Sequence, residues 1–239
     1  MSKTILVTGA SSGIGRAIAI ACAKNGYTVV LNGRNVARLE ETRAQMSGDG
    51  HIIIPADLTD SAQRQALAEQ VPVLNGVVHC AGIGSRVLCK MLEADDVQHV
   101  MEANFNAPVV LQAALLQEKK MAAGSSIVFI ASAAATMPSV GNAIYSASKA
   151  ALISYAKCLS LELAARKIRV NCISPAMVWT DLALVGATEE QLREAEQAYP
   201  LKRYAQPEDI APMAVYLLGE ESGWVTGSNF ELTGGALTL

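Results

Sequence analysis

The sequence contains little histidine, few aromatic residues and no long uncharged apolar run. Its three histidines are far apart, and Phe, Trp and Tyr together make up 5% of the 239 residues. Dispersed histidines give no metal-ligand spacing and no histidine-based triad. A membrane-spanning helix needs an apolar run of roughly 18 residues or more, and a signal peptide needs basic and apolar regions at its start. We therefore expect no metal, no membrane association and a cytoplasmic location.

Cysteine is present in an odd number and shows no disulfide or metal pattern. The five cysteines stand in apolar surroundings without a CxxC pair: Cys22, Cys80, Cys89, Cys158 and Cys172. We expect buried free thiols, as in a reducing compartment. The net charge of −3 also lacks the basic excess that is typical of nucleic-acid binding, so nucleic acid is not an expected partner.

A glycine-rich turn lies between an expected strand and an expected helix near the start of the chain. It reads Gly9-Ala-Ser11-Ser12-Gly13-Ile14-Gly15. Gly9 suits the tight turn, Gly13 allows close approach of the backbone to a pyrophosphate, and Gly15 allows close packing of helix on strand. Free N–H groups at the helix start then face the anion. The spacing differs from the Gly-x-Gly-x2-Gly of many dehydrogenases, but its context predicts dinucleotide binding.

Strand and helix patterns alternate along the whole chain. The expected strands lie near 3–8, 28–32, 51–55, 75–80, 126–131, 168–174 and 228–232, and the expected helices near 13–25, 35–46, 61–70, 94–122, 143–166 and 207–218. Alternation of this kind predicts an α/β fold, in which helices cover both faces of a doubly wound, Rossmann-type parallel sheet of about seven strands. We expect a single domain over residues 1–239, because no linker divides the chain.

One long connection, at about 182–206, predicts a substrate lid, since long excursions from compact domains often cover a site. The apolar side chains expected to form its cover are Leu182, Leu184, Val185, Leu192 and Tyr199.

Tyr145 and Lys149 lie four residues apart in an Ala-rich helical pattern. Residues with this spacing share one helix face, so their head groups can meet. A tyrosine with its ordinary pKa of ~10 donates its proton poorly at neutral pH, and a nearby cation lowers that pKa. The pair therefore suits general acid–base catalysis. Alone, the same spacing also fits a solvated helix face; the cofactor turn favours the catalytic interpretation.

With these motifs the chain resembles the short-chain dehydrogenase/reductase family of the compact single-domain type. Thr8 to Gly15 match the cofactor turn of that family, and Tyr145-x3-Lys149 match its active-site pair. By this resemblance the catalytic residues are Asn104, Ser132, Tyr145 and Lys149. The cofactor contacts it implies are Gly9, Ser11, Ser12, Gly13, Ile14, Gly15, Arg34, Asp57, Leu58, Cys80, Ala81, Gly82, Tyr145, Lys149, Pro175, Val178 and Thr180.

The resemblance implies interconversion of a carbonyl and a secondary alcohol. Ser132 would bond the substrate oxygen, Tyr145 would donate the proton, and Asn104 would position a water of the proton relay. Lys149 would lower the pKa of Tyr145 and hold the nicotinamide ribose. Simpler roles remain open, because Ser132 could satisfy a turn and Asn104 a helix backbone.

The residues after the second expected strand indicate NADP(H) as the cofactor. An NAD enzyme usually places an acidic residue there, whereas this chain has Asn32-Gly33-Arg34. Arg34 offers a guanidinium fork to a 2′-phosphate. Ser12 stands where many NADP-binding relatives have a second basic residue. Two further departures from the family are His79-Cys80 in place of Asn-Asn, and Ala176 in place of Gly after Pro175.

Three functions stay open: reduction of a 3-oxoacyl group on acyl carrier protein, oxidoreduction of a free alcohol, sugar, steroid or carbonyl compound, and a non-catalytic cofactor-binding sensor. The resemblance is to the 3-oxoacyl-acyl-carrier-protein reductases, and the apolar lid favours an acyl chain. A basic patch for the acidic carrier could comprise Lys119, Lys120, Arg166 and Lys167, although cations at helix C-termini also suit the macrodipole. The resemblance further implies a homotetramer, through the two long helices and the segment 230–239.

Overall fold

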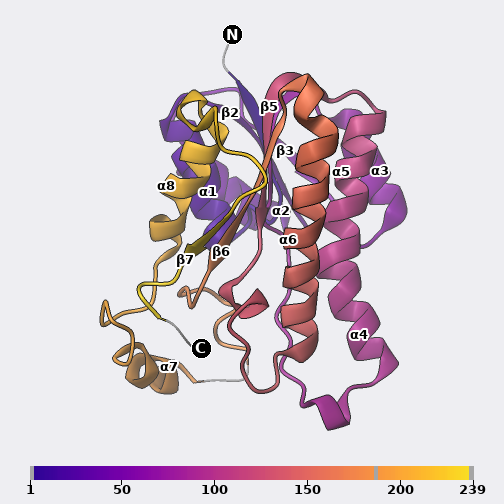
Figure 1. The fold of residues 1–239 in the computed structure, drawn as a ribbon. Helices are drawn as coiled ribbons and strands as arrows, with labels where there is room; N and C mark the ends of the chain where they lie inside the picture. Colours follow the sequence, from indigo (N-terminus) through magenta and orange to yellow (C-terminus); the bar gives the residue numbers. More distant parts are fainter. Residues whose placement is uncertain (1–2, 186–187, 237–239) are drawn as a thin grey trace.

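A seven-stranded parallel sheet forms the centre of the computed structural model, which describes residues 3–185 and 188–236. Its strand order is β3-β2-β1-β4-β5-β6-β7, and helices cover both faces (Figure 1). The predicted Rossmann-type fold is therefore confirmed. The strands are β1 Thr4–Val7, β2 Thr28–Gly33, β3 Ile52–Pro55, β4 Leu74–His79, β5 Met121–Ile130, β6 Arg169–Pro175 and β7 Asn229–Leu232.

The helices alternate with these strands in the order that the sequence patterns predict. The α-helices are α1 Gly13–Lys24, α2 Val36–Ala44, α3 Ser61–Gln70, α4 Ala94–Met101, α5 Ala107–Gln117, α6 Ala143–Leu163, α7 Glu189–Glu196 and α8 Pro207–Leu218. Short 3-10 turns lie at Cys89–Met91, Ala133–Ala135, Ala164–Arg166 and Glu220–Ser222, and a π-helical turn lies at Glu102–Asn106.

Alternate residues of each central strand point into different cores. In β5, Ile127 and Phe129 belong to the core that includes residues of α3, α5 and α6. Val128 and Ile130 belong to the other core, with residues of α1 and α8. Because successive strand side chains point to opposite faces and both faces are covered, the strand reads as an unbroken apolar run.

The chain reverses its direction across the sheet at β1, which pairs with β2 on one side and with β4 on the other. The connections that leave β1 and β4 therefore diverge at the carboxyl ends of these strands. In open α/β sheets, ligands bind in the crevice at this switch point. The fold thus predicts a site at the carboxyl edge, where Gly9 follows β1 and Cys80 follows β4.

The single helix predicted near 94–122 is wrong, because the structure divides it and ends it early. A π-turn separates α4 from α5, and α5 ends at Gln117. Pro108, in the first turn of α5, has no N–H to donate to the carbonyl four residues earlier, which favours the wider turn. Lys119 then adopts φ 55°, and β5 begins at Met121, five residues before the predicted strand.

The predicted lid contains a helix of its own. Thr188 caps α7, accepting from Gln191 N and forming a capping box with that residue. The predicted lid region also includes Gly186 and Ala187, which lie outside the described residues. The cysteines are free, as predicted, but Cys89 and Cys158 are exposed rather than buried. None of the helices in the described chain is long and apolar enough to cross a membrane.

Candidate active site

A cleft of about 410 Å³ runs along the carboxyl edge of the sheet. It is lined by residues that follow β1 to β6, which explains why they are far apart in sequence. All the predicted cofactor contacts line it: Gly9, Ser11, Ser12, Gly13, Ile14, Gly15, Arg34, Asp57, Leu58, Cys80, Ala81, Gly82, Tyr145, Lys149, Pro175, Val178 and Thr180. Ser132 lines it as well, whereas Asn104 does not.

The glycine turn has the backbone geometry that a dinucleotide requires. Gly9 has φ 67°, and a Cβ there would lie 2.9 Å from the Ala81 backbone. The turn after β1 therefore packs directly on the turn after β4. The Ser12 side chain makes no cap hydrogen bond at the start of α1, so N–H groups in this first turn remain for an anion. The residues present fit a bound pyrophosphate.

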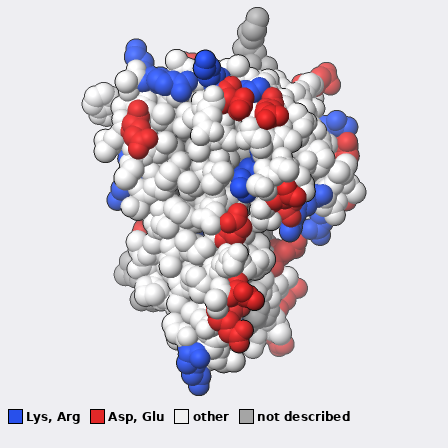
Figure 2. Space-filling model, turned by 90° about the vertical axis from the view of Figure 1, so that its right-hand side faces the viewer, with Lys and Arg blue, Asp and Glu red and all other residues white. Residues whose placement is uncertain are grey.

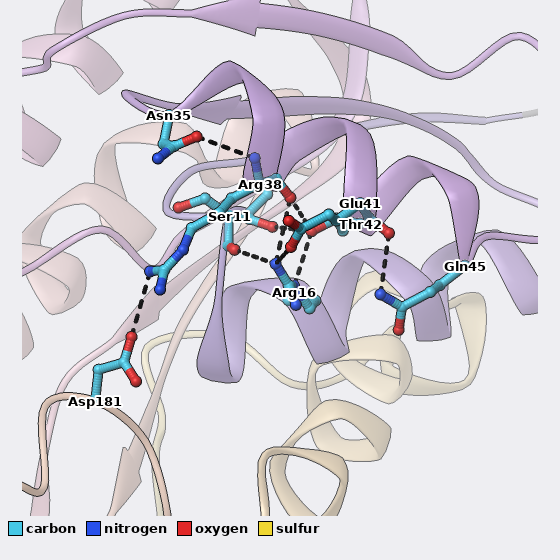
Figure 3. Close-up of polar contacts among 9 residues, drawn as sticks. Ser11, Arg16, Asn35, Arg38, Glu41, Thr42, Gln45 and Asp181 are labelled. Carbon is cyan, nitrogen blue, oxygen red and sulfur yellow. Dashed lines mark hydrogen bonds and ion pairs between the residues drawn. The ribbon is translucent and has the colours of Figure 1, made fainter.

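Thr8 and Arg16 hold this turn in place; the sequence patterns include Thr8 in the cofactor turn but assign Arg16 no role. The Thr8 hydroxyl accepts from the backbone N–H groups of Cys80, at 3.0 Å, and Ala81, at 3.2 Å. Arg16 Nη2 donates to the Ser11 carbonyl, and its Nε donates to Thr42 Oγ1 on α2 (Figure 3). The cofactor turn is thus fixed to β4 and to α2 before any ligand binds.

An ion pair joins α2 to the segment after β6. Arg38 Nη1 lies 3.4 Å from Asp181 Oδ2 (Figure 3), and Asp181 also lines the cleft. Strands β1, β4 and β5 separate β2 from β6 in the sheet, so this contact crosses the cleft. Both side chains are more than half exposed, and such a pair is worth about 0–1 kcal/mol.

Ser132, Tyr145 and Lys149 converge on the cleft from β5 and α6. Ser132 follows β5, and its hydroxyl accepts from Ala134 N at 3.1 Å. Tyr145 lies in the first turn of α6 and Lys149 in the next. Lys149 Nζ donates to the Ile130 carbonyl at 3.0 Å and lies 5.8 Å from the centre of the Tyr145 ring. The structure thus brings together the three predicted catalytic side chains that line the cleft.

The pKa of Tyr145 differs in direction from the sequence expectation. Burial raises it, and a hydrogen bond with Ser132 opposes this only in part. Burial also lowers the pKa of Lys149 to about 8. The expected lowering of the Tyr145 pKa by Lys149 is therefore absent, because the Lys149 ammonium bonds a carbonyl and not the phenol. A neutral phenol is nevertheless the form that donates a proton.

Asn104 lies in the π-turn and is fully buried. Its Oδ1 accepts from Ile83 N at 2.8 Å, and its Nδ2 donates to Ile83 O at 3.0 Å and to Ser148 Oγ at 3.2 Å. Ser148 in turn donates to the carbonyl of Tyr145. Asn104 therefore ties the segment after β4 to the helix that carries Tyr145. Its predicted role in a water relay stays a prediction.

Arg34 lies at the outer end of the cleft, where the second strand finishes. Its guanidinium is 3.8 Å from Asp57 Oδ2, and its side chain is 75% exposed. Hydrogen bonds from Thr59 are the main cause that lowers the pKa of Asp57, with the charge of Arg34 contributing less. Asp57 is thus a fixed anion at neutral pH. Most of the Arg34 guanidinium remains free to meet a ligand.

The other end of the cleft is apolar and lies against α7. Leu182, Val185 and Leu192 line it, whereas Leu184 does not and Tyr199 lines a separate cavity of about 370 Å³. Glu196 holds the end of α7, since its Oε2 accepts from Trp179 Nε1 at 2.9 Å and from Tyr204 N at 3.2 Å. Only part of the predicted cover therefore faces the cleft.

Comparison with known proteins identifies the family. A family model described as "Enoyl-(Acyl carrier protein) reductase" matches residues 9–236. The chain is 33% identical to "3-oxoacyl-[acyl-carrier-protein] reductase FabG" of Rickettsia felis over 99% of its own length and 98% of the relative. It belongs to the short-chain dehydrogenase/reductase family. It is therefore an oxidoreductase of a family that uses NAD(P)H.

Other members of this family are similar over their full lengths. "Carbonyl reductase family member 4" of Danio rerio is 30% identical, with all of both chains covered. A solved dehydrogenase/reductase from Sinorhizobium meliloti 1021 has a TM-score of 0.91 and 31% identity, covering 100% of this chain and 96% of its own. An actinorhodin polyketide ketoreductase solved with NADPH has a TM-score of 0.89 and 29% identity, covering 98% and 97%.

Two departures from the usual family residues have structural explanations. His79 stacks on Phe129, with ring centres 4.7 Å apart, and its Nε2 lies 3.0 Å from Gln112 Oε1 on α5. This pair braces the centre of the sheet where the family usually has asparagine. Ala176 keeps the local backbone, because its N–H donates to Leu232 O at 3.0 Å. Ala176 lines the cleft and packs against the cluster of Leu192, Tyr199 and Tyr204, and β6 stays paired with β7 beside it.

The four cations proposed for carrier docking do not lie beside the cleft. Lys119 and Lys120 precede β5, and Arg166 and Lys167 precede β6, which places them at the amino edge of the sheet. Lys120 donates to the carbonyls of Glu69 and Val71, and Arg166 donates to that of Met121. At ~3.3 Å per residue, the length of β5 separates this patch from Ser132.

The sequence patterns missed several residues that line the cleft: Ile83, Gly84, Ser85, Arg86, Asn142, Met177 and Asp181. The first four directly follow the Ala81-Gly82 pair, and Asn142 precedes the helix of Tyr145. Their proximity to known motifs was the only available signal. No metal-binding group of His, Cys, Asp and Glu side chains occurs within residues 3–185 and 188–236.

Proposed function

We propose that the chain is an NADP(H)-dependent reductase that converts a 3-oxoacyl thioester to its 3-hydroxyacyl form. The observation that carries the reaction type is the convergence of Ser132, Tyr145 and Lys149 beside the glycine turn in one cleft. A proton donor, an oxygen-binding hydroxyl and a cation are the groups that carbonyl reduction needs.

The residues of the cleft fit a dinucleotide, and different residues would hold its different parts. Gly9 in the turn after β1, with Gly13 and Ile14 at the start of α1, would hold the pyrophosphate. Lys149 would hold the hydroxyls of the nicotinamide ribose. Arg34 would hold an adenosine 2′-phosphate, which is the basis for preferring NADP(H). When bound, the nicotinamide supplies the hydride that reaches the carbonyl carbon.

The protein contributes the proton and its position. Ser132 Oγ accepts from Ala134 N and lies within hydrogen-bond reach of Tyr145, so a substrate oxygen placed between the two hydroxyls would accept from both. Tyr145 remains a neutral phenol because burial raises its pKa, so it carries the proton that this oxygen needs. Lys149, with a pKa of about 8, is a cation at neutral pH, and it would hold the hydroxyls of the nicotinamide ribose beside Tyr145.

The apolar half of the cleft and the names of the relatives support a 3-oxoacyl thioester as the substrate. Leu182, Val185 and Leu192 suit an acyl chain, and the relative from Rickettsia felis is a 3-oxoacyl-carrier reductase by name. A free carbonyl compound is the second candidate. The distance of the basic patch from the cleft favours it, as does the carbonyl reductase from Danio rerio.

A carbonyl panel with both NADPH and NADH tests these proposals. The purified chain is given a 3-oxoacyl carrier-protein thioester, the same acyl group as a small thioester, simple ketones and sugars. We expect the highest kcat/KM with the carrier thioester and NADPH. An equal kcat/KM with a simple ketone would favour the second candidate function, the reduction of free carbonyl compounds. If neither cofactor is turned over with any compound of the panel, the non-catalytic cofactor-binding sensor would be the remaining function.

A further inference from the structure

Arg86 is a charged residue of the cleft that the proposed mechanism does not use. It follows β4 and lines the cleft together with Ser85 and Asn142. The other charges that line the cleft have partners: Arg34 lies near Asp57, Asp181 near Arg38, and Lys149 bonds a carbonyl. Within the described part of the chain, no hydrogen bond and no ion pair engages the Arg86 side chain.

The loop before α6 holds Arg86 in position. Val87 N donates to Gly141 O at 2.9 Å. Gly141 has φ 83°, and a Cβ built there would lie 3.5 Å from Arg86 Cγ. The aliphatic stem of Arg86 therefore lies along the segment that leads into the helix of Tyr145. An arginine that packs its stem in this way presents its guanidinium beyond the packed surface.

The charge of Arg86 also reaches the aromatic residues below α7. Burial and the charge of Glu196 raise the pKa of Tyr204, and the charge of Arg86 lowers it. Tyr204 packs against Tyr199 and Trp179, and the Trp179 indole bonds Glu196 at the end of α7. Arg86 thus stands between the first turn of α6 and the segments that carry the apolar lining of the cleft.

An apolar lining with one unpartnered cation at its edge is complementary to a substrate with an anionic group. Guanidinium pairs with carboxylate and phosphate through parallel N–H···O bonds. We propose that Arg86 binds an anionic oxygen group, a carboxylate or a phosphate, of the carbonyl substrate. This inference rests on the proposed carbonyl reduction and assigns the substrate class of the same cleft.

Two matched substrate pairs test the inference and distinguish the two sources of the anion. The first pair is 3-oxobutanoate and its methyl ester. The second is the 3-oxobutanoyl thioester of phosphopantetheine and that of pantetheine. In each pair the reacting ketone is the same and only the anionic group differs. The measurement is the ratio of kcat/KM for the charged member to that for the neutral member.

The variants are Arg86→Gln, Arg86→Lys and a control, Lys90→Gln. Lys90 lies in the same connection and carries the same charge, but it does not line the cleft. We expect Arg86→Gln to lower the ratio for one of the two pairs by ~10-fold or more, as for the loss of a charge-assisted hydrogen bond. Arg86→Lys should retain part of the preference, and Lys90→Gln should retain all of it.

A lower ratio for the 3-oxobutanoate pair would identify the anion as a carboxylate, and a lower ratio for the phosphopantetheine pair would identify it as a phosphate. An unchanged ratio for both pairs in Arg86→Gln would overturn the inference, while turnover of the neutral members would leave the proposed reductase intact. If the wild-type chain reduces no member of either pair with NADPH or NADH, both proposals fail together. An equal melting temperature and equal NADPH affinity of all variants show that fold and cofactor site are preserved.

Discussion

At the scale of single residues, Tyr145 carries the proton on which the proposed reaction depends. Tyr145→Phe removes this proton and keeps the ring. We expect kcat on the best carbonyl substrate to fall by ~10²–10⁴-fold, the usual contribution of general acid–base catalysis. NADPH affinity, measured by fluorescence titration, should change little. Wild-type turnover by this variant would show that another group supplies the proton.

Arg34 is the residue on which the choice of cofactor depends. Its side chain is largely exposed, and its guanidinium is only 3.8 Å from Asp57. Arg34→Ala should raise the KM for NADPH by ~10-fold or more and leave that for NADH nearly unchanged, because only NADPH carries the 2′-phosphate. Arg43→Ala is the control, since Arg43 pairs with Glu40 on α2. An equal effect of Arg34→Ala on both cofactors would contradict NADP specificity.

His79 makes stability depend on pH. Burial lowers its pKa from 6.5 to about 4, so between these values the unfolded chain binds a proton that the folded chain does not. The contribution of His79 to the free energy of unfolding is fully present above about pH 6.5. It falls as the pH decreases toward 4, by up to about 3 kcal/mol.

His79→Asn, which restores the usual family residue, should remove this dependence. The free energy of unfolding, measured in urea at about pH 7 and about pH 5, should fall more steeply for the wild type than for the variant. The variant also loses the stacking of the ring on Phe129, but this loss is the same at both pH values and cancels when each protein is compared with itself. Parallel decreases in the two proteins would show that His79 does not titrate in this way.

At the scale of elements, α7 depends on one carboxylate for its attachment. Glu196 accepts from Trp179 and from the Tyr204 backbone. Glu196→Ala should destabilise the docked helix by about 2 kcal/mol, the value of hydrogen bonds to a charged group. Amide exchange should then increase over Glu189–Glu196 and not in β5. Glu194→Ala, an exposed change on the same helix, is the control; equal exchange in both variants would exclude this role.

At the scale of the whole molecule, the helical face opposite α1 and α8 is the expected subunit interface. Figure 2 shows wide uncharged areas between scattered charges on this side. Leu161 on α6 is 79% exposed and Val110 on α5 is 45% exposed, and large apolar side chains on a surface favour association. The resemblance to the family implies a homotetramer, and we predict that this face pairs across subunits and that the segment near β7 makes a second contact. Residues 237–239 of the predicted C-terminal contact lie outside the described chain.

Light scattering at micromolar concentration measures this assembly directly. The wild type should have four times the mass of one chain, and Leu161→Glu should have a smaller mass because a carboxylate would be buried without a partner. Val73→Glu, which places a charge on an exposed residue at the amino edge, should not change the mass. A monomeric wild type would end the prediction.

The order of the elements, the Rossmann-type sheet and most of the residues of the cleft could be predicted from the amino-acid sequence. Buried parallel strands read as apolar runs, and the glycine turn and the Tyr145–Lys149 spacing are local patterns. The carboxyl ends of parallel strands meet at one edge, so residues placed there by sequence share a site. The helix predicted near 94–122 was wrong because the effects of Pro108 and the turn at Lys119 do not appear in a hydrophobic pattern.

The partners of the individual side chains became visible only in the folded chain. Arg38 and Asp181 are 143 positions apart, and His79 meets Gln112 because β4 and α5 pack together. Asn104 is hydrogen-bonded to the Ile83 backbone. Among the charged residues that line the described cleft, only Arg86 lacks a partner. A sequence pattern records the chemistry of each side chain, but pairing depends on the packing of distant elements.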